Sequence, residues 1–199
     1  HSQITTSDPE IFKMVNEVKT ENLEAIVKKL VSFGTRHTLS DTKSNTRGIG
    51  AAQRWVKSEF DKYALASNGR LTSKIDYFTI KADGKRISVD SELGNVMATL
   101  KGTDPTDNCV LIISGHLDSR ASDVMDAKSD APGANDDGSG VACVMELARI
   151  MSQREFPFTL IFVAVVGEEQ GLYGAKHLAD IAKEQKWNLI AMLNNDMIG

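Results

Sequence analysis

The chain has 199 residues, of which 41% are hydrophobic and 25% charged, the composition of an ordinary globular protein. The formal net charge of −4 and the lack of a basic block argue against binding to nucleic acid or to an anionic membrane surface. The longest apolar run, residues 158–166, has about half the length of a bilayer span, so the sequence predicts no transmembrane helix. The two cysteines, Cys109 and Cys143, form neither a disulfide framework nor a CxxC motif, and we expect two small buried thiols.

The first third of the chain predicts helices. Ser7, Asp8, Pro9 and Glu10 form a typical helix start, with proline and acid in the first turn. Apolar residues then recur at helical spacing over residues 20–33 and 46–65, and these segments carry no residues suited to chemistry. We interpret them as amphipathic helices that pack on a core.

The rest of the chain predicts a sheet. Residues 72–81 and 86–100 are extended, and the apolar run 109–113 is typical of a strand covered on both faces. The later segments alternate between helix and strand and are residues 140–151, 159–166, 171–186 and 189–193. This order predicts an α/β three-layer sandwich with a mixed, largely parallel central sheet flanked by helices, and antiparallel strands at its edge. We expect one domain over residues 1–199, with a helical region at 1–70 and the sheet core at 71–199.

Acidic residues or histidine follow each of the three buried strands of the second half, and acids also precede the first helix there. The segments are Ser114-Gly115-His116-Leu117-Asp118, Ala134-Asn135-Asp136-Asp137-Gly138-Ser139-Gly140, Gly167-Glu168-Glu169 and Asn194-Asn195-Asp196. In open α/β sheets, sites form outside the carboxyl ends of the strands. We therefore expect one imidazole and six carboxylates to meet at one place.

Six carboxylates cannot share a small space as free anions, because like charges would keep several of them protonated. Two divalent cations would offset most of this charge. One histidine with several acids suits zinc, with manganese or cobalt as substitutes, whereas calcium prefers a tighter loop with more carbonyl ligands. Each segment alone is typical of a surface pair, a helix cap or a solvated loop, but together they predict a metal site.

Four ordered motifs resemble the secreted zinc aminopeptidases with two co-catalytic metals, the bacterial leucyl aminopeptidase type. They are Gly115-His116-Leu117-Asp118-Ser119, residues 132–140 (PGANDDGSG), residues 167–174 (GEEQGLYG) and Asn195-Asp196-Met197. The order and spacing agree from about Asn95 to Gly199. The resemblance implies hydrolysis of N-terminal residues from peptides, two zinc ions per complete site, a peptide partner with a free N-terminus, and a secreted or periplasmic protein.

The resemblance also implies a role for each acid. His116 and Asp196 would bind one zinc, and Glu169 would bind the other. Asp136 would bridge the two, and its peptide bond to Asp137 would be cis. Glu168 would be the general base for a water that the two metals activate. Asp118 would orient His116, because a ligating imidazole normally donates its other N–H to a carboxylate.

The chain departs from the family pattern at one ligand, a downstream histidine that would share the second zinc with Glu169. His1 is terminal, His37 precedes the strands, and His177 falls inside a predicted helix as an ordinary surface or core residue. We therefore expect the sequence to be the N-terminal portion of a longer protein. On its own, this portion should bind zinc more firmly at the site of His116, Asp136 and Asp196 than at the site of Glu169. It should have little peptidase activity and should leave part of its hydrophobic core exposed to solvent.

Three alternatives remain open. A glutaminyl-cyclase-like relative would use a single zinc and a different pattern after Asp136, and the intact Asp136-Asp137-Gly138-Ser139-Gly140 argues against it. A carboxypeptidase relative would need basic residues for a terminal carboxylate, for which Arg120 is the one nearby candidate. A non-catalytic binding domain should have lost ligands or the base, and this chain retains six such residues: His116, Asp118, Asp136, Glu168, Glu169 and Asp196.

Overall fold

The computed structural model describes residues 8–199, so Ser7 and His1 lie outside the described residues. The predicted helices are present: α1 (Pro9–Asn16), α2 (Thr20–Val31), α3 (Ile49–Leu65), α4 (Gly138–Met151) and α5 (Tyr173–Glu184). Helix α3 begins three residues later than predicted, after Gly48, whose φ of 86° lies in the left-handed region. Helix α5 begins at Tyr173 because residues 168–172 form a hydrogen-bonded turn.

The strands also follow the sequence pattern: β1 (Leu71–Ile80), β2 (Ser91–Leu100), β3 (Cys109–His116), β4 (Thr159–Val165) and β5 (Asn188–Asn194). The second predicted strand starts five residues later than expected. The carboxylate of Asp83 accepts hydrogen bonds from the backbone N–H groups of Lys85, Arg86 and Ile87, and this turn occupies the chain before β2.

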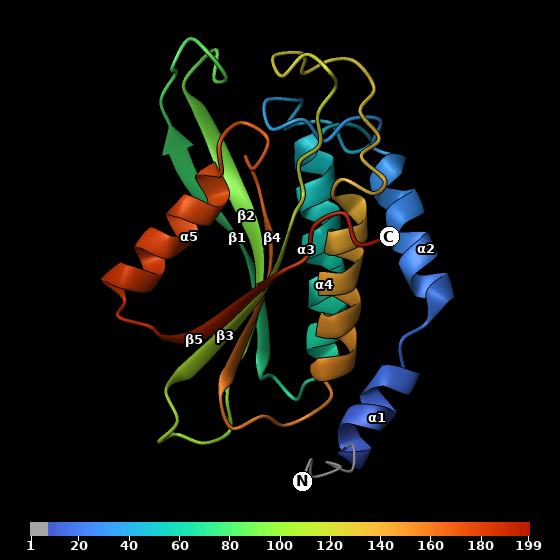
Figure 1. The fold of residues 1–199 in the computed structure, drawn as a ribbon, viewed down its shortest axis with the longest axis vertical. Helices are drawn as coiled ribbons and strands as arrows, with labels where there is room; N and C mark the ends of the chain where they lie inside the picture. Colours follow the sequence, from blue (N-terminus) through green and yellow to red (C-terminus); the bar gives the residue numbers. More distant parts are fainter. Residues whose placement is uncertain (1–7) are drawn as a thin grey trace, which may run out of the picture.

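The five strands form one mixed sheet in the order β1-β2-β4-β3-β5. Strand β1 pairs antiparallel with β2, and β2 antiparallel with β4, whereas β3 is parallel to both β4 and β5. The predicted antiparallel strands at the edge are therefore confirmed. Helices α2, α3 and α4 lie on one side of the sheet and α5 lies on the other (Figure 1), which gives three layers.

The larger hydrophobic core lies between the sheet and α2, α3 and α4. Val56 and Phe60 of α3 and Phe162 of β4 are fully buried in it. A smaller cluster on the opposite face contains Val163 of β4 and Leu178 of α5. The continuous apolar sequence of β4 thus reflects a central strand that is covered on both faces.

Strand β5 differs from the prediction of a buried strand. Its apolar side chains are exposed, from 42% for Leu189 to 54% for Leu193, because β5 has a partner on one side only and no described helix covers it. The expected exposure of apolar surface is therefore found on β5. The cysteines also differ from expectation, since Cys109 and Cys143 are both partly exposed.

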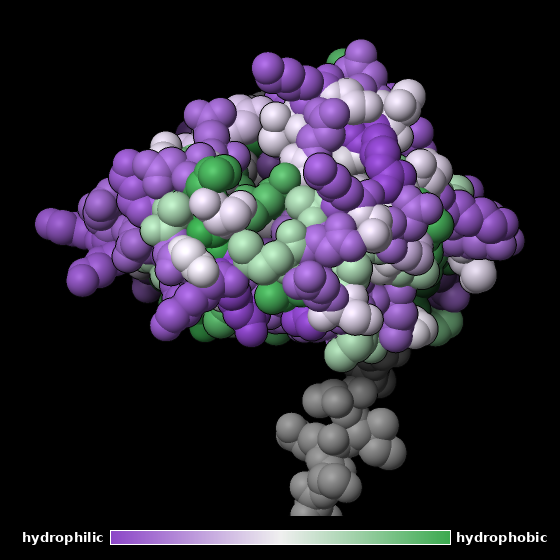
Figure 2. Space-filling view, turned by 90° about the horizontal axis from the view of Figure 1, so that it is seen from above, coloured by the Kyte–Doolittle hydropathy of each residue, from purple (hydrophilic) through white to green (hydrophobic). Residues whose placement is uncertain are grey.

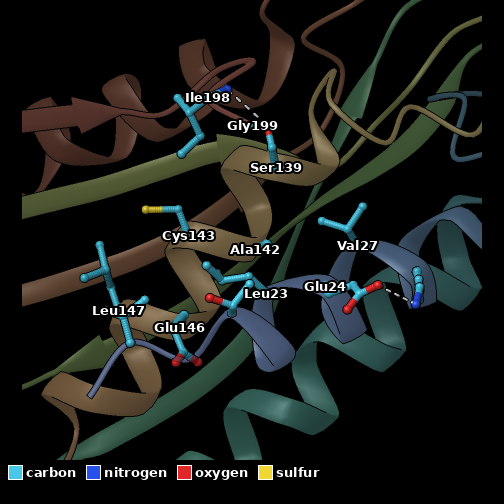
Figure 3. Close-up of a pocket in the computed structure, with 13 residues that line it drawn as sticks. Leu23, Glu24, Val27, Ser139, Ala142, Cys143, Glu146, Leu147, Ile198 and Gly199 are labelled. Carbon is cyan, nitrogen blue, oxygen red and sulfur yellow. Dashed lines mark hydrogen bonds and ion pairs between the residues drawn. The ribbon is translucent and has the colours of Figure 1, made fainter. Parts of the chain in front are cut away.

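An apolar groove of about 540 Å³ runs between α2 and α4. Leu23 and Val27 of α2 face Ala142 and Leu147 of α4 across it, and Ile198 lies at its end (Figure 3). Within residues 8–199, no helix combines the length and the apolar character needed to cross a bilayer.

A buried arginine joins the end of β3 to two loops. Arg36 is 0% exposed, and its guanidinium donates to four backbone carbonyls, those of Leu30, Leu117, Pro132 and Gly133. Burial lowers its pKa to about 10, so the group stays charged at neutral pH. It therefore fixes the loop before α4 against the loop after β3.

Replacing Arg36 with methionine should lower the free energy of unfolding of the whole protein by at least about 3 kcal/mol, because several buried carbonyls would lose their donors. Arg54→Met is the matched control. Arg54 also donates to two backbone carbonyls, those of Thr42 and Ser44, but it does so at the surface. Denaturant unfolding measures both variants, and equal losses would contradict this assignment to Arg36.

Candidate metal centre

The carboxyl ends of three strands meet at one edge of the sheet. His116 ends β3 and lies opposite Val165 of β4, while Ser114 lies opposite Asn194 at the end of β5. The loops that follow these strands therefore start side by side, as parallel topology requires. Figure 2 views the molecule from above relative to Figure 1, and hydrophilic residues make up most of that face.

His116, Asp136 and Asp196 form the cluster best suited to a cation. The Nε2 atom of His116 lies 3.1 Å from Oδ1 of Asp136 and 3.9 Å from Oδ1 of Asp196. One ligand atom from each residue lies within 4.8 Å of the others. His116 is buried, whereas the two aspartate side chains are 49% and 40% exposed, so the cluster opens to solvent. One imidazole nitrogen and two carboxylate oxygens are a donor set that fits zinc.

The peptide bond between Asp136 and Asp137 is cis, as the resemblance implies. The two neighbouring aspartates have different surroundings. Asp136 is exposed and lies in the cluster, whereas Asp137 is fully buried.

Asp118 is a buried neighbour of His116. Its carboxylate is 0% exposed and accepts hydrogen bonds from the backbone N–H groups of Glu168 at 3.2 Å and Glu169 at 3.1 Å. Its Oδ1 atom lies 3.8 Å from Nδ1 of His116, and that Nδ1 is 3.0 Å from the backbone carbonyl of Asp118. The hydrogen bond of the imidazole therefore goes to the carbonyl of Asp118, with the carboxylate as a charged neighbour. Either contact fixes the tautomer that leaves Nε2 facing the aspartates.

Glu168 and Glu169 lie next to the cluster without belonging to it. Oε2 of Glu169 is 3.8 Å from Nε of Arg120, and the carbonyl of Glu169 accepts a hydrogen bond from Arg86. Of the acids predicted as metal ligands, Asp136 and Asp196 therefore gather around His116, and Glu169 lies outside that group.

The acids perturb one another strongly. Burial raises the pKa of Glu169 to about 7, helped by the nearby charges of Asp136 and Asp118. Burial also raises the pKa of Glu168. Burial alone would lower the pKa of His116, but the carboxylates around it, first that of Asp118, hold it at about 10. Without a cation, the negative charges of these carboxylates therefore repel one another, and a bound dication would offset that repulsion.

The carboxylate of Asp137 ties three segments together. It accepts hydrogen bonds from the N–H groups of His116, Gly140 and Met197, which belong to β3, α4 and the segment after β5. Burial raises its pKa to about 6. Only glycine fits at position 140, because a Cβ atom there would lie 2.3 Å from the carbonyl oxygen of Asn195. The sequence predicts Asp137 as one of the six acids of the site. In the structure it lies outside the cluster of His116, Asp136 and Asp196 and holds neighbouring backbone segments in place.

Sequence reasoning missed the residues that surround Asp118. Thr38 is buried and donates to Asp118, Gln170 is buried against Thr38, and Arg36 holds the adjacent loop. The position of Gln170 directly after the two glutamates is a local signal that could have indicated it, but nothing in the sequence marks Thr38. His177 is a helix residue as predicted, since it pairs with Asp76 and stacks on Phe78.

Comparison with known proteins identifies the family. Residues 95–199 match the model of peptidase family M28, so the chain belongs to that family. A "Probable zinc metalloprotease" of Leptosphaeria maculans is 48% identical over 192 residues, which are 96% of this chain. The chain spans 44% of the length of that relative.

Solved structures share the fold. The LapA aminopeptidase of Legionella pneumophila aligns over 100% of this chain and 49% of its own, with a TM-score of 0.74 and 22% identity. A glutaminyl cyclase of Fimbriiglobus ruber aligns over 89% of this chain and 61% of its own, with a TM-score of 0.69 and 20% identity. Because the same fold occurs in an aminopeptidase and in a glutaminyl cyclase, the fold alone does not distinguish between these two activities.

Replacing Asp137 with asparagine should lower the free energy of unfolding by about 1–3 kcal/mol, because the amide turns an N–H toward a backbone donor and leaves it unpaired. Asp8→Asn is the matched control. Asp137 caps α4 and Asp8 caps α1, but Asp8 is exposed, and within residues 8–199 its carboxylate accepts the N–H of Glu10 alone. Asparagine caps a helix as well as aspartate does. A loss at Asp137 no larger than at Asp8 would show that the three bonds are not needed.

Proposed function

We propose that the protein is a zinc-dependent aminopeptidase that hydrolyses the first peptide bond of substrates with a free N-terminus. The observation that supports this most is the cluster of His116, Asp136 and Asp196, with Glu168 and Glu169 adjacent, at the carboxyl edge of the sheet. Membership of peptidase family M28 agrees with it. The same proposal places the protein outside the cytoplasm, secreted or periplasmic.

His116, Asp136 and Asp196 would hold one zinc ion, and Asp136 with Glu169 would contribute to a second. When bound, zinc supplies a Lewis acid that polarises the scissile carbonyl and makes water more acidic. Asp118 would keep the His116 ring oriented, and the backbone bonds from Glu168 and Glu169 to Asp118 hold the backbone of both glutamates beside the cluster.

Glu168 would act as the general base. It would take a proton from the attacking water and pass it to the leaving amine, a transfer that contributes typically 10²–10⁴-fold to rate. Glu169 is engaged by Arg120 at 3.8 Å, so the two adjacent glutamates have different neighbours. This difference supports separate roles for the two side chains, with Glu169 as a metal ligand and Glu168 as the general base.

The activity test uses the full-length protein and compares aminoacyl-p-nitroanilides with their N-acetylated forms. Metal-dependent cleavage of the free amines alone is expected, because a blocked N-terminus removes the group that defines an aminopeptidase. A chelator should abolish turnover and zinc should restore it. Cyclisation of an N-terminal glutaminyl peptide without cleavage would favour the cyclase, and release of C-terminal residues would favour a carboxypeptidase.

In the full-length protein, replacing Glu168 with glutamine should lower kcat by at least about two orders of magnitude and leave the zinc content unchanged, since the amide keeps the shape but cannot accept the proton. Glu184→Gln, a change of the same kind at the end of α5, should have no effect. Metal analysis and steady-state kinetics measure both. Unchanged turnover in the Glu168 variant would remove it from the mechanism.

A further inference from the structure

The buried carboxylate of Asp118 has a third hydrogen bond, which comes from outside the predicted site. Oγ1 of Thr38 lies 2.8 Å from Oδ2 of Asp118, and Thr38 is 2% exposed. The two residues are 80 positions apart, because Thr38 lies in the loop between α2 and α3. Oδ2 also accepts the N–H of Glu169. One oxygen thus joins the loop of Thr38 to the pair of glutamates.

Thr38 also contacts the residue that follows the glutamates. Its Oγ1 lies 2.8 Å from Oε1 of Gln170, so a single hydroxyl proton faces two oxygens. The charged carboxylate of Asp118 is the stronger acceptor, and we assign the proton to it. Gln170 in turn donates to the carbonyl of Val124 at 2.8 Å, so the turn over residues 168–170 is fixed at both ends.

The loop that presents Thr38 is itself held firmly. His37 is 0% exposed, its Nδ1 accepts the N–H of Leu39, and its Nε2 lies 2.9 Å from the carbonyl of Val124. Ser40 donates to the carbonyl of His37 and accepts from the N–H of Ile49 at the start of α3. The Thr38 hydroxyl therefore stands at a fixed point and not on a mobile surface.

We propose that Thr38 is a positioning residue for the metal centre, acting through Asp118. The inference rests on the proposed function. Without the hydroxyl, the carboxylate of Asp118 keeps the N–H groups of Glu168 and Glu169 but loses its bond to the loop of Thr38, so its orientation beside His116 is held less firmly. Both the first metal position and the Glu168–Glu169 turn then lose part of their orientation. Residues that orient a metal ligand are worth about 10- to 100-fold in affinity or activity, and Thr38 acts through such a residue, Asp118.

The test uses the full-length protein with Thr38→Val, which replaces the hydroxyl by a methyl group of similar size. Zinc affinity, measured by competition with a chromophoric chelator, should fall about 10- to 100-fold, and kcat should fall more than KM rises. Thr38→Ser should restore both, because it returns the hydroxyl. Rescue by serine separates positioning from simple packing.

Thr35→Val is the matched control, because Thr35 is equally buried in the same loop, and among the described residues its hydroxyl bonds to the N–H of His37 and not to Asp118. It should keep zinc affinity even if it lowers stability. If Thr38→Val does not fold, Thr38→Ala carries the same expectation.

Wild-type zinc affinity and kcat in a folded Thr38→Val protein would overturn the positioning role while the zinc peptidase proposal stands. Failure of the wild-type protein to bind zinc would overturn both.

Discussion

Crowding of acidic side chains at the carboxyl edge of the sheet is the constraint on which this structure depends. Acids from the loops after β3, β4 and β5 and from the start of α4 meet there because the strands end in register. Burial raises the pKa of Glu169 to about 7, and the charges of Asp136 and Asp118 add to this effect. The carboxylates around His116, first that of Asp118, hold its pKa at about 10 although burial lowers it. Folding alone would disfavour such an arrangement, and a bound dication would make it favourable.

Hydrogen-bond donors from several segments of the fold stabilise two of these acids, Asp118 and Asp137. Asp118 receives hydrogen bonds from Thr38, Glu168 and Glu169, and Asp137 receives three backbone N–H groups. These two carboxylates are fully buried, whereas Asp136 and Asp196 are half exposed at the opening. The buried acids thus build a rigid base, and the exposed acids are free to bind a cation.

Much of the fold and part of the site could be predicted from the sequence, because the signals are local. The apolar run of β4, the helical spacing of α3 and the acids after each strand all follow from neighbouring residues. What could not be predicted depends on distant contacts. Nothing near Thr38 in sequence indicates a bond to Asp118, nor does the sequence show that Arg36 is buried or that Asp137 supports the site while Asp136 faces solvent. The exposure of β5 follows from its place at the edge of the sheet, which its apolar composition does not reveal.

The most direct test of the account is an X-ray diffraction experiment on crystals of the full-length protein grown with zinc, with data collected on both sides of the zinc absorption edge. The account predicts an anomalous peak within bonding distance of His116 Nε2 and of carboxylate oxygens of Asp136 and Asp196. A map without a peak at this position, with the two aspartates turned away from the imidazole, would contradict it.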